Sequence, residues 1–236
     1  MKKNFHAIVR ARRTIAAILI AALAGSTAAA QPSSRIPADC DRRCLEELID
    51  QYLGAVIAHD PAQLPLSVDV KFTENEQRLN VGDGFWQTAT GRGNYNHYFA
   101  DPTTSQAAWM GTMREGSTLL LMALRLRVQL GRIAEIEMSY FRPAGGGPND
   151  MAAMDARGTP EALWLEAIPV SQRATRNELI EIANAYFEAV QRNDGHGFYP
   201  FTDDCDRIEN GAHTTNNPSG RVPYHLNSAW GGLSGR

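Results

Sequence analysis

The sequence of 236 residues lacks the short motifs of the commonest nucleotide-dependent and hydrolytic enzymes. It has no P-loop, no Gly-rich GxGxxG fingerprint, no GxSxG nucleophile elbow and no HExxH metal-binding pair. Phosphate binding, dinucleotide binding, serine hydrolysis and zinc proteolysis each depend on such residues at fixed spacing. We therefore predict none of these activities, and no cofactor.

Cysteine is also scarce, with three residues in the chain: Cys40, Cys44 and Cys205. No CxxC or HxxxH spacing accompanies them, so no metal site is predicted. Cys40 and Cys44 lie four residues apart at the start of an expected helix, so a bridge between them is sterically possible. Pairing of either one with Cys205 is the alternative, and an odd set leaves one thiol outside a disulfide.

Acidic residues are absent from residues 1–30, which hold five of the 23 basic residues. This segment runs from a basic stretch (1–13) through a short apolar stretch (14–24) to small residues that end at Ala30. That layout is typical of a secretory signal peptide, here cleaved after Ala30. An uncleaved membrane anchor is the alternative, but the apolar stretch is short for a bilayer span. We predict a secreted or periplasmic protein, with residues 31–40 as a linker.

The charge of the chain changes once residues 1–30 are removed. The remainder has 18 basic and 26 acidic residues, a net charge of −8. A field of that sign does not attract phosphate backbones, so nucleic acid is not expected as a partner. After signal cleavage, no membrane association is expected either.

Apolar periodicity predicts an amphipathic helix over residues 41–59, capped by Asp39 or Asp41 and ended by Pro61. Its apolar face consists of Leu45, Leu48, Ile49, Tyr52, Leu53, Val56 and Ile57. This helix opens the domain predicted over residues 41–142.

The rest of that domain reads as sheet, with a short helix over residues 85–89. Strands are predicted over residues 68–73, 94–101, 106–115, 118–128 and 133–141. The last two strands alternate polar and apolar residues on either side of a Gly-containing turn, which predicts an antiparallel hairpin. In it, Arg125 or Arg127 is expected to face Glu135 or Glu137.

The second half of the chain is predicted to be an incomplete copy of the first. Residues 143–174 are rich in Pro and Gly and are predicted to be a linker. A second helix is predicted from Thr175, with Glu178 completing a capping box. At an offset of 134 residues, Leu45, Tyr52 and Val56 match Leu179, Tyr186 and Val190. Residues 175–236 then lack the sheet of the first copy, because the chain is a fragment or frameshifted, or because its second half is an appendage.

The order of elements over residues 41–142 resembles the NTF2-like (SnoaL-like) cone fold, and the motif that carries the resemblance is Leu130-Gly131-Arg132-Ile133-Ala134-Glu135-Ile136. The segment Cys205-Asp206-Arg207-Ile208-Glu209-Asn210-Gly211 after a second helix is similar to secreted tandem proteins of unknown function. A more distant resemblance is to a fungal isomerase of the patulin pathway. The resemblance implies an α+β fold in which a curved antiparallel sheet packs helices on its concave side, followed by an incomplete second copy.

The resemblance also implies a pocket for a small organic molecule beneath the first helix. A carboxylate or imidazole in such a pocket has its pKa shifted toward neutrality, which suits acid–base chemistry. The candidate catalytic residues are Asp60 or His97 as general base, with Tyr98. The candidate substrate-binding residues are Tyr52, Trp86, Trp109 and Tyr140. Some have a structural alternative: a turn for Asp60, and a surface or hydrogen-bonded structural role for His97. For Trp86, Trp109 and Tyr98 the alternative is packed core.

Two functions remain open at this point. The first is a secreted small-molecule-binding protein that acts as a cofactor-independent isomerase, lyase or dehydratase on a small oxygenated compound. The second is a non-catalytic binding or assembly module that forms a homodimer through its sheet. An enclosed pocket with a carboxylate or imidazole favours the enzyme, whereas a cavity filled by Trp109, Met110 and Met122 favours the module.

Overall fold

A computed structural model of the chain describes residues 35–143, 149–192, 201–202 and 205–215. The predicted signal peptide lies outside the described residues. Among the described helices, none combines the length and apolar character needed to cross a bilayer.

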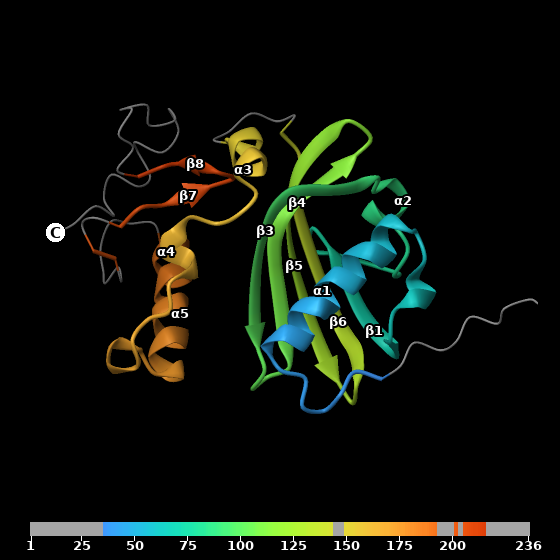
Figure 1. Ribbon diagram of the computed structural model, residues 1–236, viewed down its shortest axis with the longest axis horizontal. Helices are drawn as coiled ribbons and strands as arrows, with labels where there is room; N and C mark the ends of the chain where they lie inside the picture. Colours follow the sequence, from blue (N-terminus) through green and yellow to red (C-terminus); the bar gives the residue numbers. More distant parts are fainter. Residues whose placement is uncertain (1–34, 144–148, 193–200, 203–204, 216–236) are drawn as a thin grey trace, which may run out of the picture. The chain divides into compact units, whose positions relative to one another are not determined.

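A curved six-stranded sheet forms the centre of the described part (Figure 1). Its strands are β1 (Leu66–Glu74), β2 (Gln77–Leu79), β3 (Gly91–Asp101), β4 (Gln106–Glu115), β5 (Thr118–Gln129) and β6 (Arg132–Phe141). Their spatial order is β2-β1-β6-β5-β4-β3. All neighbours are antiparallel except β1 and β6, which run parallel. The α+β fold with a curved sheet is confirmed.

The β5–β6 hairpin has the predicted register. It turns at Leu130 and Gly131, both with positive φ. Arg125 lies opposite Glu137, and its Nε donates to Glu137 Oε2 at 2.9 Å. Arg127 lies opposite Glu135, and its Nη1 donates to Glu135 Oε1 at 3.2 Å. The charges that alternate in the sequence thus form cross-strand ion pairs on one face of the sheet.

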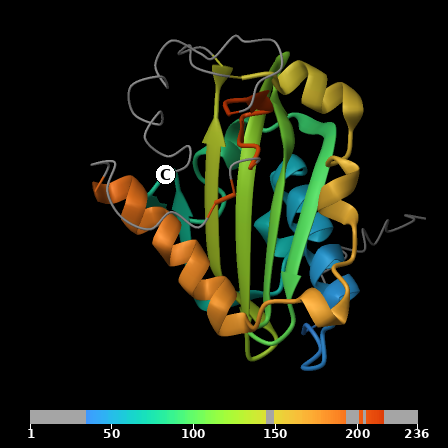
Figure 2. The ribbon, with the colours of Figure 1, turned by 90° about the vertical axis from the view of Figure 1, so that its left-hand side faces the viewer.

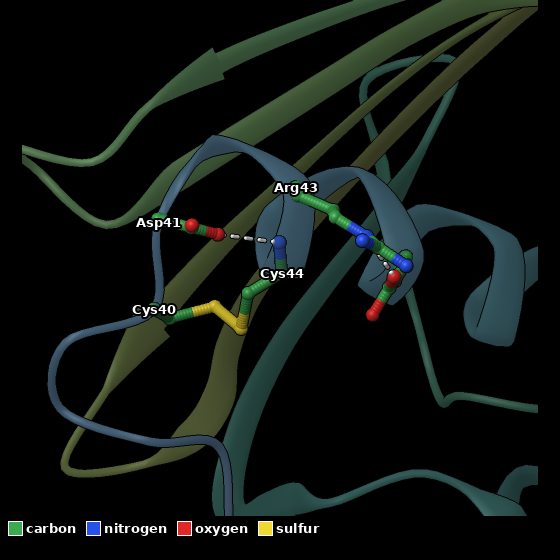
Figure 3. The surroundings of a disulfide bond; sticks show 5 residues. Cys40, Asp41, Arg43 and Cys44 are labelled. Atoms are coloured by element: carbon green, nitrogen blue, oxygen red, sulfur yellow. Dashed lines mark hydrogen bonds and ion pairs between the residues drawn. A yellow bond between two sulfur atoms is a disulfide. The ribbon is translucent and has the colours of Figure 1, made fainter.

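Helix α1 (Arg42–Ile57) packs on the concave face of the sheet (Figure 1). Asp41 caps it, since the Cys44 backbone amide donates to Asp41 Oδ1 at 2.9 Å. The Cys40–Cys44 disulfide closes the same turn (Figure 3), while Cys205 is exposed and outside any disulfide. The buried residues of α1 meet the inward-facing residues of the strands in one core, which includes Leu45, Ile49, Leu53, Trp109, Leu124 and Ile136. The short elements η1 (Pro61–Gln63) and α2 (Phe85–Thr88) lie between α1 and β3 in the chain.

The opposite, convex face carries elements from the second half of the chain (Figure 2). The segment predicted as a linker contains α3 (Met151–Arg157), α4 (Ala162–Leu165) and η3 (Val170–Gln172). Met151 and Met154 of α3 form a second small core with Tyr95 of β3 and Leu121 of β5. The two-stranded hairpin β7 (Ile208–Glu209) and β8 (Ala212–His213) joins α3 through a hydrogen bond from the Asp150 amide to the Asn210 carbonyl, 2.9 Å long.

Helix α5 (Arg176–Arg192) begins with the predicted capping box. The Thr175 amide donates to Glu178 Oε2 at 2.7 Å, and the Glu178 amide donates to Thr175 Oγ1 at 3.3 Å. Its apolar face matches that of α1 in sequence but not in burial: Leu179 is 57% exposed and Phe187 68%. Among the described residues from 175 onward, β7 and β8 are the only strands. The repeat itself stays a prediction.

Candidate functional site

Aromatic side chains fill the concave interior where the sequence predicted a pocket. Tyr52, Trp86 and Trp109 have no exposed surface. The rings of Tyr52 and Trp86 meet edge to face at 5.4 Å, and the Trp86 Nε1 donates to the Tyr52 hydroxyl at 3.1 Å. Burial raises the pKa of Tyr52 well above its ordinary value, so its hydroxyl stays protonated. The structure therefore places these three predicted substrate-binding residues in a packed core.

Tyr140 belongs to a buried hydrogen-bond group around Glu74, a residue that sequence reasoning missed. The Tyr140 hydroxyl donates to Glu74 Oε1 at 2.8 Å, and the Phe85 amide donates to Glu74 Oε2 at 2.8 Å. A Cβ at Gly84 would meet the same carboxylate. Burial, and then the hydrogen bond to Glu74, raise the pKa of Tyr140. This group fixes the start of α2 to the end of β1, a structural role.

Asp60 is a turn residue in the structure. Its Oδ1 accepts from the Ala62 amide at 3.0 Å, and its Oδ2 accepts from the Gln63 side chain at 3.2 Å. Both oxygens thus cap η1, which was the structural alternative for this residue.

Tyr98 lies in a polar cluster between α1 and β3. Its hydroxyl donates to Asp50 Oδ1 at 2.7 Å and accepts from Arg92 Nη2 at 2.8 Å. Arg92 Nη1 also donates to Asp50 at 2.7 Å, and the Trp109 Nε1 donates to Asn96 Oδ1 at 3.1 Å. Burial, and then the hydrogen bond to Asp50, raise the pKa of Tyr98. The cluster ties the helix to the sheet, with each of these groups satisfied by another.

His97 faces the other side of the sheet from Tyr98, because neighbouring residues on a strand point to opposite faces. Its ring lies 4.1 Å from that of Phe99 and 6.0 Å from that of Trp164, between centroids. Burial lowers the pKa of His97 below its ordinary value, so the imidazole is neutral at pH 7. His97 and Tyr98, two of the predicted catalytic residues, therefore lie on opposite faces of the sheet and cannot contact the same small substrate.

A pocket of about 180 Å³ opens beside His97 on the convex face. Its walls come from β3, β4, β5, α3, α4 and the β7–β8 hairpin, and we call it the convex-face pocket. Its aromatic and apolar lining includes Tyr95, His97, Phe99, Met110, Met154 and Trp164. Its charged lining is the ion pair of Arg157 and Glu161, 3.6 Å apart. It therefore combines ring surfaces, one neutral imidazole and one ion pair.

Asp155 holds the α3 wall of this pocket against the sheet. This carboxylate is 7% exposed and accepts from the Asn94 amide at 2.6 Å and from the Thr112 hydroxyl. Arg114 adds an ion pair at 3.5 Å. Burial alone would raise the pKa of Asp155, but the hydrogen bonds outweigh it and the pKa is lowered. A Cβ at Gly93 would overlap both Thr112 and Asp155, so the chain approaches this closely only at a glycine.

Sequence reasoning found His97 but missed the other polar residues of the pocket. Arg157 and Glu161 lie in the segment predicted as a linker, on or next to helices of seven and four residues. Helices this short show too little periodicity to be recognised, although Met151, Met154 and Gly158 are a weak signal of one. Within the described ranges, no group of three or more His, Cys, Asp or Glu residues is arranged to hold a metal ion.

Comparison with known proteins gives one family match over part of the chain and several solved structures of similar fold. A family described as a domain of unknown function (DUF8021) matches residues 172–233, which include α5 and the β7–β8 hairpin. Of the curated proteins, none matches this sequence.

Three solved structures illustrate the likeness of fold. An NTF2-like protein of unknown function from Cytophaga hutchinsonii is 9% identical, over 46% of this chain and 93% of that one, with a TM-score of 0.34. A protein provisionally described as a polyketide cyclase from Pseudomonas putida is 20% identical, over 42% and 91%, with a TM-score of 0.33. One provisionally described as a ketosteroid isomerase from Kribbella flavida is 14% identical, over 57% and 97%, with a TM-score of 0.37.

Proposed function

We propose that this protein binds a small organic molecule in the convex-face pocket, beside His97. One observation carries the proposal: the concave interior is filled by Tyr52, Trp86 and Trp109, whereas ring surfaces and polar groups converge on the pocket at His97. Binding sites for small molecules are concave and mostly apolar, with a few well-placed polar groups. The signal peptide predicted over residues 1–30 supports a protein that acts after export.

A second candidate function is cofactor-independent acid–base catalysis at the same pocket. A neutral imidazole at His97 can accept a proton, and Glu161 supplies a carboxyl group to the same lining. This pair would suit isomerisation, elimination or dehydration of a small oxygenated compound. Turnover of a bound molecule that stops in a His97→Gln variant would favour this function over binding alone.

A homodimer through the sheet receives less support. The convex face that would form it already carries α3 and the β7–β8 hairpin. The neighbouring strands present the Arg125–Glu137 and Arg127–Glu135 ion pairs, and charged surfaces of this kind are depleted in the centres of interfaces. We therefore favour the small molecule as the partner.

Paired variants on the two faces of β3 test the proposal. A panel of small organic molecules is screened against the full chain by the change in thermal midpoint, and each hit is titrated. His97→Ala is expected to abolish binding, while Tyr98→Phe, one residue away on the opposite face, leaves it unchanged. Hits that respond to Tyr98→Phe and ignore His97→Ala would move the site to the concave face and refute the proposal.

A further inference from the structure

The convex-face pocket also limits the kind of molecule that it can hold. Its volume is about 180 Å³. Sites for drug-sized ligands occupy about 300–1,000 Å³, whereas a dry cavity of about 150 Å³ is enough for benzene. The pocket can therefore enclose a single six-membered ring with one or two small substituents, whereas a molecule of several fused rings would extend beyond it.

The lining of the pocket points to an aromatic ring. The ring of His97 contacts that of Phe99 at an interplanar angle of 40° and that of Trp164 at an angle of 68°. Offset and edge-to-face contacts of this kind are the favoured arrangements between aromatic groups. Phe99, Met110 and Trp164 are 38%, 43% and 61% exposed although they line a concavity. A flat ring in the pocket would cover this apolar surface, which otherwise faces water.

The charges of the pocket favour a neutral hydroxyl on that ring. Arg157 and Glu161 pair at 3.6 Å and cancel within the lining, and His213 lies 3.8 Å from the same Glu161 carboxylate. An anionic ligand would be attracted by Arg157 but repelled by Glu161, so its negative charge would add little to the free energy of binding. A hydroxyl can instead donate to the Glu161 carboxylate, and a hydrogen bond to a charged acceptor is stronger than a neutral one.

From size, lining and charge together, we infer that the ligand of the convex-face pocket is a single-ring phenol, with its ring against His97, Phe99 and Trp164 and its hydroxyl donating to Glu161. This inference rests on the proposed function and narrows it to one chemical class. It also separates this pocket from sites that enclose molecules of several fused rings, because a volume of about 180 Å³ is too small to enclose them.

The experiment compares five probes on the full chain: phenol, anisole, benzoate, cyclohexanol and 2-naphthol. Binding is followed by NMR, through the resonances of the His97 imidazole and the Trp164 indole. Phenol is expected to shift both and to bind about tenfold more tightly than anisole, which has the ring but no hydroxyl to donate. Benzoate, cyclohexanol and 2-naphthol are each expected to bind more weakly than phenol. Benzoate carries a negative charge beside Glu161, cyclohexanol has no aromatic ring face, and the second ring of 2-naphthol extends beyond the pocket.

Two variants connect the preference to Glu161. Glu161→Gln is expected to bring phenol to within about twofold of anisole, since a neutral amide is a weaker acceptor than a carboxylate. Glu166→Gln, an exposed residue just after α4, is the control and keeps the tenfold preference. Thermal midpoints and far-UV circular dichroism show that both variants are folded.

The outcomes distinguish the inference from the proposed function beneath it. If phenol binds no better than anisole, or if 2-naphthol binds more tightly than phenol at His97, the ligand class is wrong and the binding site stands. If none of the five probes shifts His97, while a larger molecule from the screen does so, the inference also fails alone. If no molecule of any size binds in a His97-dependent way, the proposed function fails with it.

Discussion

Replacement of Asp155 by alanine should release the α3 wall of the convex-face pocket. The Thr112 hydroxyl has no exposure and would lose its carboxylate partner, at a cost of about 1–3 kcal/mol for an unsatisfied buried group. The Asn94 amide is nearer to solvent and would lose about 1 kcal/mol. We therefore expect the free energy of unfolding to fall by roughly 3 kcal/mol in urea denaturation. Hydrogen exchange should quicken first in the amides of α3.

The pH dependence of this contribution follows from the lowered pKa of Asp155. Because the pKa is lower in the folded chain than its ordinary value of 3.8, the carboxylate stabilises the fold above that value. The stabilisation is lost as the pH falls below 3.8 toward the lowered folded pKa. The gap in stability between the natural chain and Asp155→Asn should therefore narrow over that range.

Asp60→Ala is the matched control for the loss at Asp155. It removes a carboxylate that also accepts two hydrogen bonds, but in an exposed turn, so the cost should be about 1 kcal/mol or less. The reasoning would be refuted if Asp155→Ala cost no more than Asp60→Ala, or if exchange in α3 stayed as slow as in β5.

Three further expectations concern the same framework. Gly93→Ala should lower the free energy of unfolding by about 2 kcal/mol or more, because the added Cβ would overlap Thr112 and Asp155. At Gly91 an added Cβ meets nothing within 4 Å, so Gly91→Ala should cost far less. Equal losses for the two variants in urea unfolding would contradict this. Arg176→Ala should raise the pKa of Asp101 from about 2 toward its ordinary 3.8, as read by carbon NMR of the carboxyl group, and an unchanged titration would exclude the pair. Reduction of the Cys40–Cys44 disulfide should lower the free energy of unfolding by about 2 kcal/mol, because the bond closes a short loop and so restricts the unfolded chain. The same loss is expected in a Cys205→Ser variant, in which the third thiol is removed.

The sequence predicted local structure well because local periodicity determines it. The ranges of α1, β4, β5 and β6 follow from apolar spacing and turn residues, and the Arg125–Glu137 pair follows from the register of one hairpin. The parallel pairing of β1 with β6 joins residues about 65 positions apart, such as Phe72 and Ile136, so no local pattern could predict it.

The candidate site was harder to predict for the same reason. Alternation along β3 already implies that His97 and Tyr98 point in opposite directions, but which face is concave depends on where α1 packs. The wall that turns the His97 face into a pocket depends on Asp155, 61 residues from Asn94 and 43 from Thr112. A contact over that distance is specified by the assembled fold rather than by a spacing in the chain.

Side chains of β3 point alternately to the two faces of the sheet, and this affects how the sequence can evolve. Enzymes that hold their reactive groups inside the core face a trade-off between stability and activity, because one set of side chains serves both. Here, the residues of β3 that pack beneath α1, such as Tyr98, are different from those that line the pocket, such as His97 and Phe99. Substitutions at the pocket can therefore accumulate without weakening the packing beneath α1, and they can change which ligand is bound on this face of the sheet.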